Sequence, residues 1–416
     1  MSRCGAPIHQ KREMIPFEEA LANILEDVPT LPSETVALSE SHGRVLFDDV
    51  KARENQPSSP LSSRDGYAFR AKKGKTLHLE ISGEVRAGGT TIKELEEGHA
   101  VRIFTGAPLP KGADSVLMQE DASFTDEKLV ISADYPKGKY VRQIGSDCQV
   151  GELMLKKGTR LNGAHLALLA SLGVIQLSVV RRPTVGFLVN GDEIVAPGTF
   201  PCPPGAIRNS NKAAIENLIS EAGGRAIYMG AVGDDAKALA KVFKEAPALD
   251  LLITIGGASV GDYDYVLQTA MNDGYEIAFS RIALKPGKPT IFGRKGNTRL
   301  IGLPGNPVSC IVVFQLLAKP LLLSLAGASE IQMAQSSARL ASDEKKEKSR
   351  RYFLPGTLRC GKDGLVEAIP SRHRESSALA SLAEARVLIV LPEGQDFIAK
   401  GSTVDILHLD RKEVAR

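Results

Sequence analysis

The sequence carries little excess charge of either sign. Its 416 residues include 52 Lys and Arg against 49 Asp and Glu, which gives a formal net charge of +3. So small an excess of positive charge does not form a continuous basic surface that could follow a phosphate backbone over a protein of this size. The composition therefore disfavours general binding to nucleic acid or to a membrane surface, and it leaves room only for a local basic pocket.

Cysteine and histidine are scarce, and neither clusters. The cysteines have no close spacing of the kind found in zinc knuckles or redox pairs, so we expect buried thiols in a reducing compartment. The seven histidines are equally scattered, which disfavours a histidine-ligated transition metal. The basic N-terminal stretch lacks the apolar centre of a secretory signal, and a cytoplasmic protein is expected. The cysteines are Cys4, Cys148, Cys202, Cys310 and Cys360.

One apolar run is long enough to raise the question of a membrane span. It covers residues 308–325 (VSCIVVFQLLAKPLLLSL) and is interrupted by Gln315, Lys319 and Pro320. A charge in the middle of a span is costly in lipid. We therefore expect a buried helix, kinked near Pro320, rather than a membrane span.

What the sequence does contain is typical of a globular protein with many turns. Hydrophobic residues make up 43% of the chain and charged residues 24%, with 39 glycines and 23 prolines. This composition excludes a disordered or collagen-like chain. At roughly 150 residues per domain, the length indicates about three units, and two to four are compatible with it.

The pattern along the chain predicts a multidomain α/β plus β fold. Short β-type runs separated by Gly and Pro indicate a β-rich inserted domain. Alternating strand and helix patterns follow and predict a doubly wound, mostly parallel sheet, with Ser210 as the cap of its first helix. We expect a small helical linking domain (1–47 and 148–182), the inserted β domain (48–147), the α/β domain (183–329) and a C-terminal β domain (330–416).

Three loops of the α/β region have the residues that an oxyanion site needs. The glycines of GGASVGDYD (256–264) let backbone N–H groups approach an anion beside a helix N-terminus, and LPGNPVS (303–309) repeats the design. KPGKP (285–289) places two lysines on a stiff turn. The alternatives are a plain tight turn and a solvated basic turn. The candidate ligand-binding residues are Gly257, Ser259, Gly261, Lys285, Lys288, Pro304, Asn306 and Ser309.

Acidic residues also fall where the predicted strands end. Clustered carboxylates repel an anionic ligand unless a hard cation lies between them, which suggests Mg²⁺. Helix capping is the alternative for Asp234 and Asp235. The candidate metal ligands are Glu193, Asp234, Asp235 and Asp264, and Asp192 lies beside them in the sequence.

Five motifs in order resemble the molybdopterin molybdenumtransferase family, which includes MoeA and the gephyrin E domain. They are TGAPLPKGADSVLMQED, VRQIGSDCQVGE, GGASVGDYD, KPGKP and LPGNPVS. The resemblance implies an elongated homodimer of four-domain subunits in the cytoplasm. It also implies insertion of molybdate into adenylylated molybdopterin, with release of AMP in a Mg²⁺-dependent step, and possible contact with the upstream adenylyltransferase.

The same resemblance assigns roles to individual residues. Asp65 of SSRDGYA would be an acid contributed across the dimer, with Thr105 nearby. Glu193 and Asp264 would be catalytic carboxylates, and Asp234 or Asp235 would join them around metal and phosphate. The serines and lysines would hold the pterin phosphate or the molybdate; these are Ser259, Ser309, Lys285 and Lys288.

The chain departs from the family pattern at several positions. Arg64 replaces the methionine usually found before the acid of the Asp-Gly-Tyr-Ala motif, and Val189 and Asn190 replace a Ser-Thr pair. Pro355 follows Phe-Leu where members often have arginine, and either Arg350 or Arg351 is a candidate substitute. These departures motivate a second hypothesis, a family member that binds the pterin cofactor as a carrier or scaffold without inserting metal. A third is a pterin adenylyltransferase, which would leave the β-rich domains and Asp65 without a role.

Overall fold

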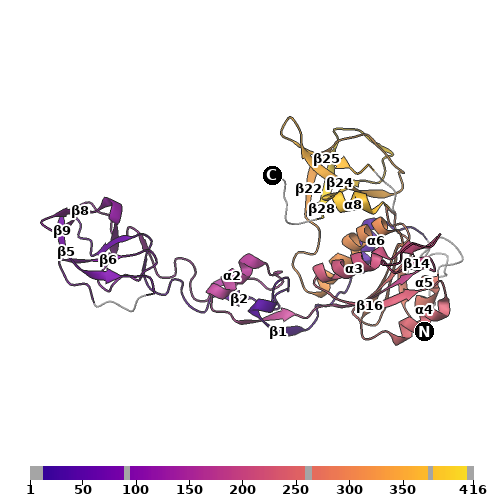
Figure 1. The fold of residues 1–416 in the computed structure, drawn as a ribbon, viewed down its shortest axis with the longest axis horizontal. Coiled ribbons are helices and arrows are strands. Elements are labelled where there is room, and N and C mark those ends of the chain that lie inside the picture. The colour runs from indigo at the N-terminus through magenta and orange to yellow at the C-terminus, as the bar shows by residue number, and fades with distance from the viewer. Residues whose placement is uncertain (1–12, 89–93, 258–264, 373–377, 410–416) are drawn as a thin grey trace. The chain divides into compact units, whose positions relative to one another are not determined.

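The structure is a computed structural model that describes residues 13–88, 94–257, 265–372 and 378–409. The chain divides into two compact units, shown in Figure 1. The inserted unit comprises Asp49–Lys156 and Ala167–Ile175, and the large unit comprises the described part of the remainder. Helix α2 (Gly163–Ser171) contributes residues to both units.

The inserted unit is built on a six-stranded sheet with the order β7-β4-β6-β5-β9-β8. Alternate residues of its strands face opposite ways, so the sheet has a separate hydrophobic cluster on each side: Phe69 and Leu117 belong to one, and Ala68 and Val116 to the other. The strands are β4 (Gly66–Phe69), β5 (Leu77–Val85), β6 (His99–Ile103), β7 (Ser115–Met118), β8 (Ser123–Thr125) and β9 (Lys128–Ile131). Shorter elements are β2 (Val50–Lys51), β3 (Leu61–Ser62), η3 (Gln119–Asp121), β10 (Val141–Arg142) and β11 (Leu153–Leu155).

The large unit contains the predicted α/β sheet, with the order β16-β13-β17-β21-β20-β18. Its first four strands are parallel, whereas β20 pairs antiparallel with both β21 and β18. The short connection between β20 and β21 allows only an antiparallel pair, because a parallel crossover needs a dozen or more residues. The strands are β13 (Thr184–Asn190), β16 (Arg225–Val232), β17 (Leu251–Ile255), β18 (Glu276–Phe279), β20 (Ile291–Lys295) and β21 (Thr298–Leu303).

Helices cover both faces of this sheet, as the sequence predicted. Ile215 and Ile219 of α3 (Ser210–Glu221) pack in one cluster with Phe187, and Leu239 and Phe243 of α4 (Ala236–Glu245) pack in the other. Further elements are α1 (Phe17–Leu25), α5 (Tyr265–Asn272), β1 (Ser33–Ala37) paired with β12 (Gln176–Val180), η2 (Leu38–Glu40), and β14 (Ile194–Val195) paired with β15 (Ile207–Arg208).

The apolar run forms a core helix of the large unit. It comprises α6 (Pro307–Val313), a π-helical turn (Phe314–Ala318) and α7 (Lys319–Leu325). Residues 307–325 are long and apolar enough to cross a membrane by length and composition, but most of this stretch is buried inside the protein. Pro320 has no N–H to donate to a carbonyl four residues earlier, and the wider π turn lies directly before it.

The C-terminal sheet has the order β19-β24-β25-β22-β28-β26, and an additional β24–β26 pairing closes it on itself. Its strand β19 (Leu284–Lys285) comes from the α/β region and pairs parallel with β24, placing Lys285 opposite Tyr352. The other elements are β22 (Gln335–Leu340), β23 (Glu344–Lys345), β24 (Arg351–Cys360), β25 (Val366–Pro370), α8 (Leu379–Glu384), β26 (Val387–Leu391), β27 (Phe397–Ile398) and β28 (Thr403–His408).

Two local expectations were wrong. Cys148 and Cys310 are buried thiols, but Cys202 is only half-buried and Cys360 is exposed near the end of β24; Cys4 lies outside the described residues. The cap of α3 is Asn209, whose side chain accepts a hydrogen bond from the Lys212 N–H at 2.9 Å, and Ser210 is the first residue of the helix. Asparagine and serine are about equally good caps, so the sequence alone could not decide which of the neighbours Asn209 and Ser210 is the cap.

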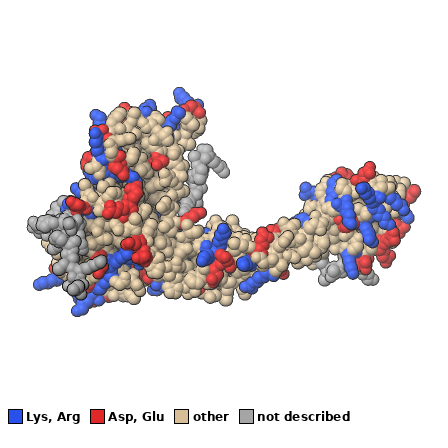
Figure 2. Space-filling view, turned by 180° about the vertical axis from the view of Figure 1, so that it is seen from behind, with Lys and Arg blue, Asp and Glu red and all other residues tan. Residues whose placement is uncertain are grey.

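On the face of the molecule shown in Figure 2, Lys and Arg are interspersed with Asp and Glu.

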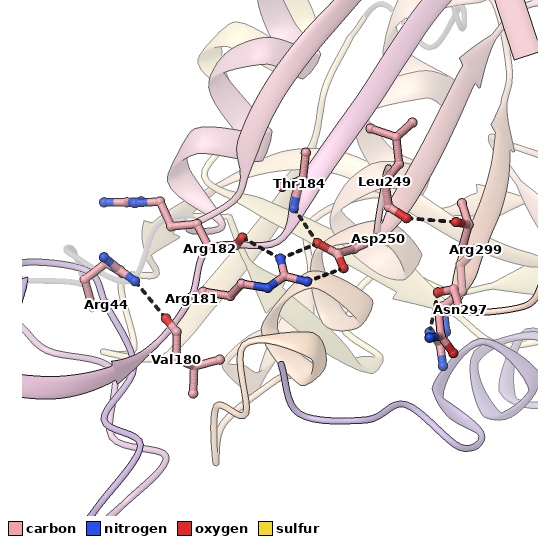
Figure 3. A network of polar contacts seen from close by, with 10 residues as sticks. Arg44, Val180, Arg181, Arg182, Thr184, Leu249, Asp250, Asn297 and Arg299 are labelled. Carbon is pink, nitrogen blue, oxygen red and sulfur yellow. Dashed lines mark hydrogen bonds and ion pairs between the residues drawn. The ribbon is translucent and has the colours of Figure 1, made fainter. Parts of the chain in front are cut away.

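At the edge where the parallel strands begin, the Asp250 carboxylate accepts several hydrogen bonds (Figure 3). Its carboxylate accepts two from the Arg181 guanidinium, at 2.7 and 2.8 Å, and one from the Thr184 N–H at 2.7 Å. The backbone of Asp250 also joins β13 to β21 through Thr184 and Arg299.

We predict that Asp250→Ala destabilises the large unit by about 2–4 kcal/mol, because it leaves the Thr184 N–H and the Arg181 guanidinium without their acceptor. Differential scanning calorimetry would measure the shift of the large unit's transition. Lys241→Ala is the control: its pair with Glu245 is exposed at both ends, and its loss should cost within about 0.5 kcal/mol. Equal effects of the two substitutions would contradict a stabilising role for the Asp250 carboxylate.

Candidate active site

A cleft of about 870 Å³ lies at the carboxyl ends of the parallel strands of the large unit. Ligands of open α/β sheets bind at this edge. We call it the acidic cleft, after the carboxylates on one wall. Its lining includes Asn190 at the end of β13 and residues 191–194 after it, Asp234 after β16, Gly256 and Gly257 after β17, and Pro304 to Pro307 after β21.

Glycine allows three of these loops to approach one another backbone to backbone. Gly256 has φ +84°, and a Cβ there would lie 2.7 Å from the Asn190 carbonyl oxygen. A Cβ on Gly305 would meet the Cα of Gly256 at 3.4 Å. Side chains at 256 would therefore collide with the end of β13, whereas glycine keeps the loop backbone open toward the cleft.

The carboxylates on the cleft wall repel one another. Asp192 accepts a hydrogen bond from the Asp234 N–H at 3.2 Å, and Glu193 follows it in the chain. Desolvation, followed by repulsion from Asp192 and Glu193, raises the pKa of the Asp234 carboxyl. Among the described residues, no group of three or more Asp, Glu, His or Cys has the arrangement of a metal site. The crowded oxygens are nevertheless of the type that hard divalent cations bind.

The geometry separates the two neighbouring aspartates. Asp235 is the N-cap of α4, and its side chain accepts a hydrogen bond from the Lys237 N–H at 2.9 Å. Asp234 lines the acidic cleft. The capping alternative therefore describes Asp235, and Asp234 is the one of the pair that lines the cleft.

Two buried asparagines line the same cleft. Asn190 and Asn211 are each 6% exposed, and the Oδ1 of each has no hydrogen-bond partner among the described residues. Asn211 Nδ2 donates to the Gly305 carbonyl at 2.7 Å, which fixes the orientation of its amide and ties α3 to the loop after β21. Sequence reasoning missed Asn211; its place in the first turn of α3 was the available signal.

A second cavity, of about 470 Å³, contains the lysines of KPGKP. We call it the cationic pocket, because Lys285, Lys288 and Arg350 line it together with the buried Ser309. The Lys285 ammonium lies 5.0 Å from the ring centroid of Tyr352, a cation–π distance. Gly287 packs on α6, since a Cβ there would lie 2.2 Å from a methyl group of Val313.

The two cavities share a wall. Pro289 lines both, while Asn306 and Pro307 line the acidic cleft and the next residues, Val308 and Ser309, line the cationic pocket. The fold thus brings most of the predicted residues of the large unit to two adjoining cavities. Glu193, Asp234, Gly257, Pro304 and Asn306 line the first, and Lys285, Lys288 and Ser309 line the second. Ser259, Gly261 and Asp264 lie outside the described residues.

The structure also distinguishes the two arginines near the start of the C-terminal sheet. Pro355 lines the cationic pocket, and so does Arg350. Arg351 does not; its guanidinium pairs with Glu393 at 2.8 Å and with Glu18. Of the two, Arg350 is therefore the residue that brings a guanidinium to the pocket beside Pro355.

Asp65 and Thr105 form a separate candidate group in the inserted unit. The Asp65 carboxylate accepts hydrogen bonds from the Thr105 N–H at 2.7 Å and the Thr105 hydroxyl at 2.8 Å. These bonds, with a smaller contribution from Arg102, lower the pKa of Asp65. Gly66 fixes the start of β4, because a Cβ there would lie 1.8 Å from the Leu117 carbonyl oxygen. The Arg64 guanidinium lies 6.0 Å from the Tyr140 ring centroid.

We predict that Asn211→Ala loosens the loop after β21, because the Gly305 carbonyl loses its buried donor, at a cost of about 1–3 kcal/mol. Amide hydrogen exchange over residues 303–307 should become faster. The matched control is Asn217→Ala on the same helix, whose amide donates to the Ala213 carbonyl on an exposed face. Unchanged exchange in the Asn211 variant would show that this bond does not hold the loop.

Family models and individual relatives match the chain along most of its length. The MoeA N-terminal region (domains I and II) matches residues 15–173, a probable molybdopterin binding domain matches 186–324, and the MoeA C-terminal region (domain IV) matches 337–409. Relatives called molybdopterin molybdenumtransferase include one from Bacillus subtilis, 33% identical over 96% of this chain and 95% of its own. Another, from Haemophilus influenzae, is 33% identical over 94% of this chain and 98% of its own. The crystal structure of a molybdopterin biosynthesis MoeA protein from Pyrococcus horikosii matches with a TM-score of 0.79 and 31% identity, over 96% of this chain and 100% of that one. The chain belongs to the MoeA family of molybdopterin molybdenumtransferases.

Proposed function

We propose that this chain is a molybdopterin molybdenumtransferase, which inserts molybdate into adenylylated molybdopterin and releases AMP in molybdenum cofactor biosynthesis. The observation that carries the proposal is the shared wall between the acidic cleft and the cationic pocket. The substrate carries a phosphoanhydride, and another part of the same molecule receives the oxyanion. Such a substrate needs a metal-binding acidic cleft and an anion-binding cationic pocket side by side. The full-length match to transferases of this name supports the same reaction.

The cationic pocket is the proposed molybdate site. Molybdate is a tetrahedral dianion, and Lys285 and Lys288 on a stiff turn lose little freedom when they bind it. Ser309, in the first turn of α6, places a hydroxyl in the same pocket. Lys285 is further restrained by its strand pairing with β24 and by the Tyr352 ring. The pocket thus holds the oxyanion in one place, which is how binding promotes a reaction between two substrates.

The acidic cleft is the proposed site of the phosphoanhydride and its Mg²⁺. Gly256 and Gly257 let a phosphate approach the loop backbone, and Glu193 and Asp234 would hold the cation. Asp264 would join them. When bound, Mg²⁺ would neutralise the charge of the phosphoanhydride. Desolvation, followed by repulsion from Asp192 and Glu193, raises the pKa of Asp234. The repulsion supports this assignment, because a cation between the carboxylates would relieve it.

We further propose a cytoplasmic homodimer, in which Asp65 of one copy acts at the acidic cleft of the other, and which receives its substrate from the upstream adenylyltransferase. Asp65 is suited to this, since its lowered pKa keeps it ionised at neutral pH and Thr105 fixes one carboxylate oxygen.

The decisive assay supplies adenylylated molybdopterin, molybdate and Mg²⁺ and measures AMP. We predict that Asp65→Asn abolishes AMP release while the protein stays folded, because the change removes charge and little volume, and the Thr105 donors can still bond to the asparagine oxygen. Glu80→Gln is the control: an exposed carboxylate of the same unit, paired with Lys128 at 2.9 Å. It should release AMP normally.

Other outcomes of this assay are equally informative. Release at the wild-type rate from the Asp65 variant would remove this residue from the mechanism. Binding of the adenylylated pterin by the wild-type protein without any release would favour the carrier hypothesis. Consumption of ATP with unadenylylated pterin would favour the adenylyltransferase.

For the metal, we predict that Asp234→Asn weakens binding of Mn²⁺, a spectroscopic substitute for Mg²⁺, by about tenfold, since one carboxylate ligand is lost. Electron paramagnetic resonance of free Mn²⁺ measures this without the reaction. Asp235→Asn is the neighbouring control, because asparagine caps a helix as well as aspartate does. Equal affinities in the two variants would contradict the role of Asp234.

A further inference from the structure

The cations of the cationic pocket are unequally neutralised. Arg350 pairs with Glu347: its Nε donates to Glu347 Oε2 at 2.9 Å, and a terminal nitrogen donates to the other carboxylate oxygen. The Arg350 side chain is only 16% exposed, and that of Glu347 is 56% exposed. Within the part of the chain that the structure describes, Lys285 and Lys288 have no carboxylate partner within ion-pair distance.

Glu347 lies next to Arg350 of this pocket, and its backbone is held by Tyr352. Its backbone N–H donates to the Tyr352 hydroxyl at 3.1 Å. The ammonium groups of Lys285 and Lys346 lie 5.0 and 5.2 Å from the ring centroid of the same tyrosine. Hydrogen bonding to Arg350, together with the charges of Arg350, Lys285 and Lys288, lowers the pKa of Glu347. The carboxylate is therefore ionised at neutral pH and interacts with every cation of the pocket.

We propose that Glu347 is an intramolecular counter-anion that competes with the bound oxyanion for Arg350 and so limits how tightly the pocket holds it. The proposal rests on the proposed function, with molybdate in the cationic pocket. The three cations that line the pocket carry a formal charge of +3, and the Glu347 carboxylate beside Arg350 offsets one of these charges.

Limited affinity suits a substrate that has to be passed on. Binding that stabilises the bound oxyanion without stabilising the transition state of its transfer does not raise the rate. A carboxylate that re-forms its pair with Arg350 as the oxyanion leaves would offset part of the lost attraction. Glu347 is in this sense a specificity-determining residue, since its repulsion acts on a ligand in proportion to the ligand's charge.

The test is calorimetric titration of wild-type protein and Glu347→Gln with sodium molybdate, and separately with perrhenate, a tetrahedral monoanion, at one low ionic strength and without pterin. We expect Glu347→Gln to bind molybdate about tenfold more tightly, the scale of one partly screened charge interaction. Because a monoanion feels half the repulsion, perrhenate should gain only about threefold, the square root of that factor. Glu367→Gln is the matched control, which breaks the pair with Arg359 (3.1 Å) outside the pocket. Its affinities should be unchanged.

Three results would overturn the proposal. Weaker molybdate binding by Glu347→Gln would mean that Glu347 positions Arg350 rather than competing for it. Equal gains in molybdate affinity in Glu347→Gln and Glu367→Gln would mean that the effect comes from the net charge of the protein and not from the position of Glu347. No gain in Glu347→Gln, with binding lost in Lys285→Ala, would reject the role of Glu347 and leave the molybdate site standing. If Lys285→Ala has no effect, or neither wild type nor Glu347→Gln binds molybdate, the site in the proposed function fails as well.

Discussion

The site depends on the close approach of three loop backbones at the carboxyl end of the parallel sheet. The Asn190 carbonyl, the Gly256 backbone and Gly305 lie so near one another that a methyl group at 256 or 305 would fill the space between them. This contact joins the ends of β13, β17 and β21. The acidic cleft opens directly above it, and α6 begins from the loop that carries Gly305.

Helix α6 then separates two electrostatic environments. Residues up to Pro307 line the acidic cleft, and Val308 and Ser309 line the cationic pocket. Carboxylates and lysines placed in one cavity would neutralise each other and attract neither a cation nor an anion strongly. The start of α6 lies between the two lysines and the carboxylates, although Arg208 also lines the acidic cleft. The buried apolar helix that follows, Pro307–Leu325, anchors this partition in the core of the large unit.

Much of this arrangement could be predicted from the sequence, because it depends on local patterns. The apolar strands, the glycine loops and the lysine turn each lie within a few consecutive residues, and parallel strands bring their ends to one edge. The same reasoning could not choose between Asp234 and Asp235, since both precede a helix and only backbone geometry decides which one caps it. Nor could it predict the pairing of Lys285 with Tyr352, because a two-residue strand has no periodicity.

Arg350 shows why the remaining residues of the pocket escape sequence patterns. The resemblance placed an arginine at position 355, where this chain has proline. On β24 that position faces the cationic pocket, and the guanidinium there comes instead from Arg350, just before the strand begins. A long side chain can deliver its charge from several positions, since the pocket constrains where the guanidinium lies and not where its Cα is. A motif fixes residue positions, so the sequence could name Arg350 and Arg351 as candidate substitutes but could not decide which of them lines the pocket.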